Sequence, residues 1–549
     1  MSLEKRPKSI DLAHHLSEVA RKRNVSPLKG LQKYFNNDDL ISLAGGMPTP
    51  AYFPFVNIGA DVLNSESFSL DPTRSSAAQD KSLFVSWLLS MLGSGGPDSE
   101  RTTRISVPKA PSDEDGGLNL SEALQYGAAT GMDPTQEFIQ SFTARVYRPG
   151  YSDFATLVHG GNTDGWSRIV TTFCNPGDTI LTEEWTYPSA LSAAKPYGIQ
   201  VLPVGMDGEG LRADSLKDVL AAWDEGKGKR PHVLYTIPVG QNPSGATLGV
   251  NRRKEIYDVC VKYDVIIAED DPYYYLQLGE YVPKASRIPK TQHSLDLKDE
   301  NKRFLQSLEP TFLHLDYQGR VVRLDSFSKT IAPGVRLGWF TCNPLFANRL
   351  ERHGEVTMQS PCGLGQSLVI KLLQTWEFDG YIRWIRVRTQ RNFFLDQLSG
   401  AFDLRPTLGT QEQGAWCGRT VFTAYAKAPR TLLPDEKAFL GPAQPLFSFV
   451  PPSSGMYVWV KIHFTEKQRA SHAAVQNEES LERKLWIKIA DAGVLTAPGW
   501  FFSTDDDVSP TDPNVEGHMR MSFSQATDEK MKEGVDIFAT QLKKFFDLD

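Results

Sequence analysis

The sequence contains no long basic run, no uninterrupted apolar stretch of about 18 residues and no C-x-x-C pair. Its 59 Lys plus Arg stand against 66 Asp plus Glu, a formal net charge of -7, so the clustered positive charge that nucleic-acid binding needs is lacking. Five cysteines without metal-ligand spacing support neither a disulfide framework nor a zinc site. We therefore expect no nucleic acid, membrane or metal ion as a partner.

The N-terminal segment MSLEKRPKSIDLAHHLSEVARKRN is basic but has no apolar signal region. It contains Glu4, Asp11 and Glu18, whereas transit peptides are poor in acidic residues. We expect a cytoplasmic protein, with a mitochondrial presequence as the open alternative.

A chain of 549 residues with 40% hydrophobic content can form more than one core. We expect an N-terminal arm and capping segment at 1–60, a large domain at 61–370 and a small C-terminal domain at 371–549. In the large domain apolar strands alternate with helix-like segments, which predicts an α/β fold whose mostly parallel sheet is wrapped by helices. The small domain is expected to be α+β. The stretch near 72–118, which is loop-like around one apolar helix-like segment, is interpreted as a surface insertion. The stretch near 404–452, which lacks a clear period, is interpreted as a second surface insertion or a disordered loop.

The most informative segment is DSFSKTIAPGVRLGW, in which Lys329 follows a predicted strand. Ser326 and Ser328 precede the amine, and Arg336 follows it. An amine flanked by anion-binding side chains suggests a phosphorylated carbonyl cofactor, and pyridoxal 5'-phosphate (PLP) supplies both an aldehyde and a phosphate. For this segment alone, a lysine on a solvated turn is the alternative.

A second motif, AEDDPYYY, places Asp270 at the carboxyl end of an apolar strand, where parallel sheets bind ligands. Asp270 can pair with a protonated pyridine nitrogen, and Tyr273, after the rigid Pro272, can place its phenol at the ring oxygen. A strand-end cap, or a Mg²⁺ site shared with Asp271, is equally open for this aspartate pair alone.

Further polar side chains follow other predicted strands and helices. In HGGNTDG, glycines open a helix, so Asn162 and Thr163 are expected to meet the phosphate, although the motif is weak by itself. Asn242 in GQNPSG can bond the ring oxygen or a substrate carboxylate, Tyr187 can stack on the ring, and Arg520 offers a guanidinium fork to a substrate carboxylate. A plain turn, core packing and a surface salt bridge are the respective alternatives.

Six ordered motifs resemble those of the class I/II, fold-type I PLP-dependent aminotransferases: DSFSKTIAPGVRLGW, YTIPVGQNPSG, EDDPYYYLQ, ISLAGGMPTPAYFPF, LQYGAATG and MRMSFS. More narrowly, they resemble fungal aromatic-amino-acid aminotransferases and the 2-aminoadipate/kynurenine aminotransferases. The resemblance covers nearly the whole chain apart from the insertions near 72–118, 280–310 and 404–452. It implies the fold-type I fold and PLP as the cofactor.

The resemblance also implies individual roles. Lys329 would form the Schiff base and carry the proton, Asp270 would pair with the pyridinium, and the remaining cofactor-binding residues would be Asn162, Thr163, Tyr187, Asn242, Tyr273, Ser326, Ser328 and Arg336. Tyr126 in LQYG would reach the neighbour's phosphate, so the active unit would be a homodimer with shared active sites. Asn242 and Arg520 would hold the substrate carboxylate, and Gly46 of the arm would close over it.

The implied activity is transamination of phenylalanine, tyrosine or tryptophan with 2-oxoglutarate or another 2-oxo acid. The resemblance also admits 2-aminoadipate or kynurenine as donors, and with them a role in amino-acid or lysine biosynthesis. Another fold-type I enzyme, a β-lyase or a decarboxylase, would share the cofactor residues. A PLP-binding regulator would need a helix-turn-helix extension, for which the arm lacks length and charge. A nucleotide-binding protein would need a G-x-G-x-x-G or G-K-[ST] loop, and the sequence has neither in the required context.

Overall fold

The computed structural model describes residues 3–25, 46–65, 67, 102–111, 117–287, 296–386, 390–427, 444–474, 479–504 and 511–548. The chain divides into two compact units, and each contains several separate segments. The first unit comprises Met1–Asn175, Ile266–Tyr275 and His293–Arg388; the second comprises Pro176–Val265, Leu276–Gln292 and Thr389–Asp549. Within the described ranges, no helix has the length and apolar character needed to cross a membrane. The domain limits expected from the sequence stay a prediction.

The first unit is built from two groups of strands and the helices around them. Its strands are β1 (Asn57–Leu63), β2 (Thr102–Pro108), β3 (Ala155–His159), β9 (Ile266–Asp270), β10 (Val321–Ser326) and β11 (Gly338–Cys342). Its α-helices are α1 (Glu18–Lys22), α5 (Leu120–Ala123), α6 (Asp133–Phe142), α7 (Asn162–Phe173), α11 (Leu297–Ser307), α12 (Phe312–Leu315), α13 (Pro344–Thr357) and α14 (Gly363–Ile385).

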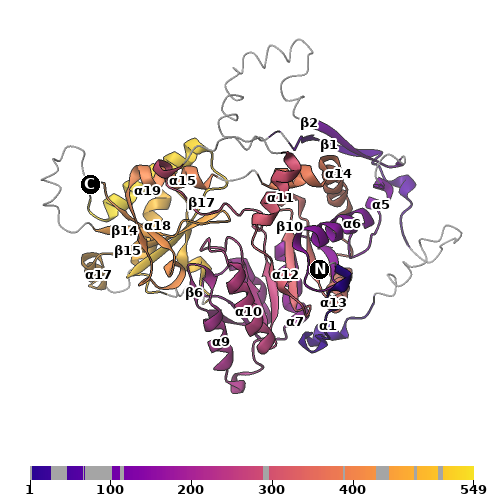
Figure 1. Ribbon diagram of the computed structural model, residues 1–549, viewed down its shortest axis with the longest axis horizontal. Helices are drawn as coiled ribbons and strands as arrows, with labels where there is room; N and C mark the ends of the chain where they lie inside the picture. Colours follow the sequence, from indigo (N-terminus) through magenta and orange to yellow (C-terminus); the bar gives the residue numbers. More distant parts are fainter. Residues whose placement is uncertain are drawn as a thin grey trace, which may run out of the picture. The chain divides into compact units, whose positions relative to one another are not determined.

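Four of these strands form the core of the first unit in the order β3-β11-β10-β9. β9 and β10 run parallel with Asp270 opposite Leu324, whereas β11 is antiparallel to both β10 and β3. Every residue of β9, β10 and β11 is buried, as expected for strands covered on both faces. Helices α7 and α12 pack beside β10 (Figure 1). The carboxyl ends of β9 and β10 therefore lie together and carry Asp270 and Ser326.

The strands β1 and β2 form a separate antiparallel ribbon that packs against α14. β2 falls within the region near 72–118 that the sequence analysis interprets as a loop-like insertion, so this part is a paired strand instead. The rest of that region between residues 68 and 101, and residues 112–116, lies outside the described residues.

The second unit contains a parallel group of strands and a larger antiparallel sheet. Its strands are β4 (Thr179–Glu183), β5 (Gln200–Val204), β6 (Met206–Asp207), β7 (Gly210–Leu211), β8 (Val233–Thr236), β12 (Asp403–Leu408), β13 (Thr420–Tyr425), β14 (Pro445–Phe449), β15 (Tyr457–His463), β16 (Ala497–Pro498) and β17 (Glu516–Ser522). Its α-helices are α8 (Pro188–Ala194), α9 (Ala213–Ala221), α10 (Val250–Lys262), α15 (Arg391–Ala401), α17 (Glu466–Ala473), α18 (Leu481–Asp491) and α19 (Asp528–Phe545).

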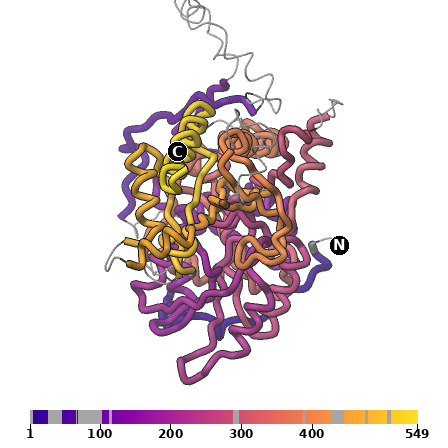
Figure 2. Tube along the Cα trace, turned by 90° about the vertical axis from the view of Figure 1, so that its left-hand side faces the viewer, coloured from indigo at the N-terminus to yellow at the C-terminus, as the bar shows by residue number. Residues whose placement is uncertain are grey.

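In the second unit β4 is parallel to both β5 and β8. The antiparallel sheet has the order β12-β13-β14-β15-β17-β16, and α15, α18 and α19 cover its apolar core (Figure 1). The C-terminal α19 packs beside α15, although the two helices lie far apart in the sequence (Figure 2).

The structure corrects the interpretation of residues 404–452 as an insertion or a disordered loop. Most of β12 and the whole of β13 and β14 come from this stretch and form half of the antiparallel sheet. β12 is an edge strand whose last four residues are exposed, so the apolar alternation that predicts a half-buried strand is missing there. Residues 428–443 lie outside the described residues.

Candidate active site

Lys329 lies on the turn that follows β10, and a helix from another part of the first unit fixes this turn. Trp384 Nε1 donates to the carbonyl oxygen of Thr330 over 2.8 Å, and the Tyr381 hydroxyl donates to Thr330 Oγ1 over 3.2 Å. The Lys329 side chain is half-buried and makes no hydrogen bond or ion pair with any part of the chain that the structure describes. An anchored turn thus presents an amine that has no partner among the described residues.

Three of the predicted phosphate-binding side chains meet beside this turn. Ser326 Oγ donates to Ser328 Oγ over 2.8 Å, and Arg336 Nη1 donates to the same Ser328 oxygen over 3.2 Å. Arg336 Nη2 also donates to the carbonyl oxygen of Gly160 over 2.6 Å. Two hydroxyls and a guanidinium therefore converge, as an anion site requires.

The N-terminus of α7 completes this group. Gly161 caps the helix with φ +96, a conformation that L side chains rarely adopt, and a Cβ on this residue would overlap the Arg336 guanidinium. The absent side chain lets Arg336 approach the first turn of the helix, whose backbone N–H groups favour an anion. Thr163 is exposed on that turn.

A buried electrostatic cluster holds the same helix start. Burial opposes ionisation of Asp164, but Arg168 and the backbone N–H of Gly160 outweigh it and lower the pKa of this carboxyl. Asp164 Oδ2 accepts from Gly160 N over 2.8 Å and lies 2.8 Å from Arg168 Nη2. Burial lowers the pKa of neighbouring His159 to about 3, so its ring is neutral. The sequence analysis missed Asp164, although it stands inside HGGNTDG.

Asp270 is tied to Asn162, which alters the role expected for the asparagine side chain. Asn162 Nδ2 donates to Asp270 Oδ1 over 2.7 Å and to the carbonyl oxygen of Leu324 over 3.2 Å. The Asn162 amide therefore orients Asp270, the predicted pyridinium partner, and the predicted role of Asn162 at the phosphate stays a prediction. Asn162 Oδ1 is buried and accepts no hydrogen bond from the residues that the structure describes, which leaves an acceptor available in the site. Tyr273 is buried just beyond β9.

The second unit brings together Asn242 and Arg520, as the sequence predicts. Arg520 Nη1 donates to Asn242 Oδ1 over 2.7 Å, and Asn242 is buried. The guanidinium carbon lies 4.2 Å from the centroid of the Tyr457 ring and 4.9 Å from that of Phe502. Arg520 Nε is buried and donates to no acceptor in the described chain. The Nη1 group of the Arg520 guanidinium thus positions the side chain, and the side of the guanidinium that carries Nε can bind a carboxylate.

Within the described ranges, the remaining predicted site residues, Tyr187, Tyr126 and Gly46, make no side-chain hydrogen bond with the groups around Lys329 and Arg520. Tyr187 is the half-buried N-cap residue of α8, where its backbone precedes Pro188. Tyr126 is 61% exposed in the first unit, and Gly46 is exposed with no atom within 4 Å of an added Cβ. The structure thus assembles one group around Lys329 and one around Arg520.

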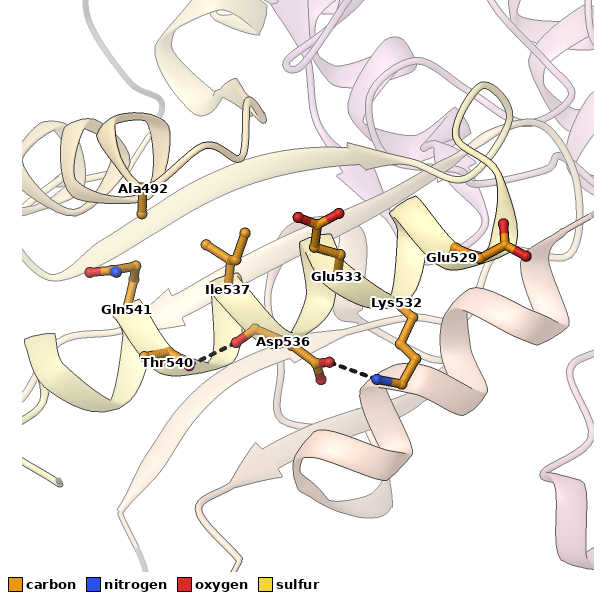
Figure 3. A pocket seen from close by; sticks show the side chains of 8 residues that line it. All are labelled: Ala492, Glu529, Lys532, Glu533, Asp536, Ile537, Thr540 and Gln541. Carbon is orange, nitrogen blue, oxygen red and sulfur yellow. Dashed lines mark hydrogen bonds and ion pairs between the residues drawn. The ribbon is translucent and has the colours of Figure 1, made fainter.

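Two surface hollows are lined by none of the predicted site residues. A groove of about 670 Å³ lies along α19, where Lys532 Nζ pairs with Asp536 Oδ2 at 3.0 Å (Figure 3). A cleft of about 1060 Å³ in the second unit is lined by charged pairs such as Arg252 with Asp207. Charged side chains in both hollows, such as Lys461 with Glu412 and Lys532 with Asp536, already form ion pairs. We therefore place the candidate active site at the group around Lys329.

Fold and residue geometry together define a PLP-dependent transferase of fold-type I. Residues 102–410 match the family model for aminotransferase class I and II, and the chain belongs to this family. An aromatic amino acid aminotransferase of Schizosaccharomyces pombe is 34% identical over 98% of both chains. An L-tyrosine:2-oxoglutarate aminotransferase of Tapinella panuoides is 31% identical, covering 99% of this chain and 97% of its own. The crystal structure of aminotransferase Aro8 from Candida albicans has a TM-score of 0.78 at 32% identity, covering 99% of this chain and 100% of its own.

These matches confirm the family, the fold class, the PLP-dependent aminotransferase class and the cofactor expected from the sequence. The residues also fit PLP chemically. The Lys329 amine has no partner among the described residues, a serine–arginine group adjoins a helix N-terminus, and Asp270 is oriented by an amide.

Proposed function

We propose that this protein is a cytoplasmic aminotransferase that transfers the amino group of an aromatic amino acid to 2-oxoglutarate or another 2-oxo acid. The support for aromatic donors is the similarity, over nearly the full length, to proteins named for aromatic amino acids or tyrosine. The observation that carries the chemistry is the anchored Lys329 turn beside the Ser326–Ser328–Arg336 group. We extend the proposal to 2-aminoadipate and kynurenine as further donors.

In this proposal, residues of the first unit hold the cofactor and move the proton. Bound PLP supplies an electron-withdrawing ring that stabilises negative charge at the substrate α-carbon. Ser326, Ser328 and Arg336 bind its phosphate with the first turn of α7, and Asp270 keeps the ring nitrogen protonated. Lys329 would hold the cofactor through its amine, and its Nζ would take the proton from the substrate α-carbon. Tyr273 would bond the ring oxygen; the ring-oxygen role of Asn242 and the stacking role of Tyr187, both residues of the second unit, stay predictions.

Residues of the second unit select the substrate by its α-carboxylate. Arg520 is held by Asn242 and by the rings of Tyr457 and Phe502, and its Nε is left without an acceptor in the described chain. A guanidinium that is already oriented loses little conformational entropy when it binds a planar carboxylate. Gly46 of the N-terminal arm would close over the bound substrate.

We propose a homodimer with shared active sites as the working unit. Several large apolar side chains of the first unit are exposed in the single chain: Met47, Tyr52, Phe55, Val56 and Tyr126. Exposed apolar side chains of this number favour burial against another protein surface. Tyr126 would contribute its hydroxyl to the phosphate site of the second copy.

A single half-reaction tests the proposed function. PLP-loaded protein is mixed with excess L-phenylalanine in the absence of an oxo acid, and phenylpyruvate is assayed while the cofactor absorbance is followed. One phenylpyruvate per active site supports the proposal. Release of ammonia and pyruvate from a suitable donor would indicate a β-lyase, and loss of CO₂ a decarboxylase. No reaction with phenylalanine, 2-aminoadipate, kynurenine or glutamate would contradict the aminotransferase assignment.

A further inference from the structure

A buried charge cluster in the first unit lies outside the roles assigned so far. Arg323 of β10 is fully buried and contacts carboxylates from two strands. Its Nη1 lies 3.2 Å from Glu269 Oε1 and 3.0 Å from Asp271 Oδ2, and its Nη2 lies 2.9 Å from Asp325 Oδ1. A buried cation with three buried carboxylates is costly to desolvate, so hydrophobic packing alone does not explain it.

The position of this cluster relates it to the proposed cofactor residues. Glu269 and Asp271 flank Asp270 in the sequence, and Asp325 directly precedes Ser326. Asp270 is paired with Leu324 in the parallel register of β9 and β10. Because neighbouring strand residues point to opposite faces, Arg323 joins the two strand ends on the face opposite to Asp270. The guanidinium thus links the carboxyl ends of the strands that carry Asp270 and lead to Lys329.

Two tyrosines extend the cluster. The Tyr147 hydroxyl donates to Asp325 Oδ1 over 2.7 Å, and the Tyr275 hydroxyl donates to the Tyr147 oxygen over 2.8 Å. The Arg323 guanidinium also lies over the Tyr147 ring, 4.2 Å from its centroid. Tyr147 therefore contacts both members of the Arg323–Asp325 pair, whereas the Tyr275 hydroxyl is one hydrogen bond further away.

The charged and titratable groups facing Asp325 have opposing effects on its ionisation. Burial raises the pKa of Asp325, and the neighbouring Glu269 adds to this rise. Arg323 and the Tyr147 hydroxyl favour the carboxylate and counter both effects. Removing the Tyr147 hydroxyl must therefore favour the protonated, neutral carboxyl.

We propose that Tyr147 and Arg323 are positioning residues of the cofactor site, which fix the ends of β9 and β10 and maintain the Asp325 negative charge that precedes Lys329. This inference rests on the proposed role of Lys329 and Asp270 in binding PLP. Neither residue contacts the reacting atoms in this account, and both act through the strands that carry those residues.

The test compares Tyr147→Phe with the matched control Tyr275→Phe, because each removes one buried hydroxyl. For each variant, the dissociation constant of PLP is measured on apoprotein, and the cofactor absorbance of the loaded protein is titrated against pH. Tyr147→Phe should raise the PLP dissociation constant about fivefold, while the control changes it less than about twofold. The absorbance midpoint of Tyr147→Phe should fall, by about half a pH unit, because the loss of negative charge at Asp325 destabilises the protonated form of the cofactor.

A purely structural role would give a different pattern. Both variants would then lose similar thermal stability as apoproteins, with equal PLP dissociation constants and unchanged midpoints, and this result would overturn the inference. Arg323→Lys, which retains the charge, should preserve more PLP affinity than Arg323→Met; equal affinities would also count against it. Failure of the wild-type protein to bind PLP would instead refute the proposed function itself, and the inference with it.

Discussion

Replacing Arg520 with lysine should weaken the capture of the substrate carboxylate while leaving cofactor binding intact. Lysine keeps the positive charge but loses the planar fork and the hydrogen bond of 2.7 Å to Asn242. It also loses the stacking of a guanidinium carbon 4.2 Å from the Tyr457 ring centroid. Because the lysine variant keeps the positive charge, any loss of substrate binding reports the geometry of the guanidinium and not the net charge.

The expected size follows from these contacts. A hydrogen bond that involves one charged group contributes about 2 kcal/mol, and a partly desolvated cation–π contact about 1 kcal/mol. The combined loss of about 3 kcal/mol corresponds to a fall of roughly 150-fold in kcat/KM. Most of this fall in kcat/KM should result from a higher substrate concentration at half-saturation in the half-reaction with L-phenylalanine. The reason is that the carboxylate is bound in both the ground state and the transition state.

Arg405→Lys is the matched control for this variant. The Arg405 guanidinium lies 4.4 Å from the Tyr425 ring centroid and pairs with Asp403 at 2.8 Å, but it is exposed on β12. This variant should behave like the wild-type protein. The reasoning is refuted if Arg520→Lys retains kcat/KM within about threefold of wild type, or if both variants lose the same activity. Phenethylamine, which lacks the carboxylate, should distinguish little between Arg520→Lys and wild type.

Three further outcomes are expected. Lys329→Ala should abolish phenylpyruvate formation while retaining measurable PLP binding by equilibrium dialysis, because the phosphate group of residues remains. Gly161→Ala should displace the Arg336 guanidinium and raise the PLP dissociation constant about tenfold, measured on apoprotein. Burial raises the pKa of Glu482 to about 7, so the folded protein holds this proton more tightly than the unfolded chain. Stability should therefore fall as the pH rises from about 5 to 7, and less so in Glu482→Gln, by calorimetry.

Matched variants exist for two of these predictions. Gly177 has φ +90 and no atom within 4 Å of an added Cβ, so Gly177→Ala adds similar backbone strain without touching Arg336. Equal PLP affinities in the two glycine variants would contradict the steric argument. Glu479 is exposed, and Glu479→Gln is the control that removes a surface carboxylate in the same way. A slope in Glu482→Gln equal to that of wild type would show that Glu482 does not carry the effect.

The cofactor site shows how far local patterns reach. The segment around Lys329 contains Ser326, Ser328 and Arg336 within a short stretch, so their convergence follows from a strand and the turn after it. The need for glycine at position 161, before α7, can likewise be inferred from the sequence motif, because only a residue without a Cβ fits there. The helix-opening motif assigns Asn162 to the phosphate, a role that stays a prediction, and no sequence pattern indicates that its amide reaches Asp270.

The antiparallel sheet shows a case in which local sequence patterns do not predict the strands. β12, β13 and β14 were expected as an insertion or a loop because Pro and Gly are frequent there and the period is weak. β12 pairs with β13, β13 with β14, and β14 with the following strand β15, so each strand is stabilised by its neighbours in the sheet. Strand propensity is set largely by packing against neighbours, so a single segment does not reveal it.

The sequence by itself determined the family, the α/β class, the cofactor and the residue types of the site, because each depends on short motifs with definite chemistry. Only the tertiary structure decided which of those side chains touch. Asn162 and Asp270 are 108 positions apart, and Tyr147 and Asp325 are 178 apart. Hydrogen bonds of this kind require atoms to approach within about 3 Å, and that proximity arises only when separate strands and helices pack into one core.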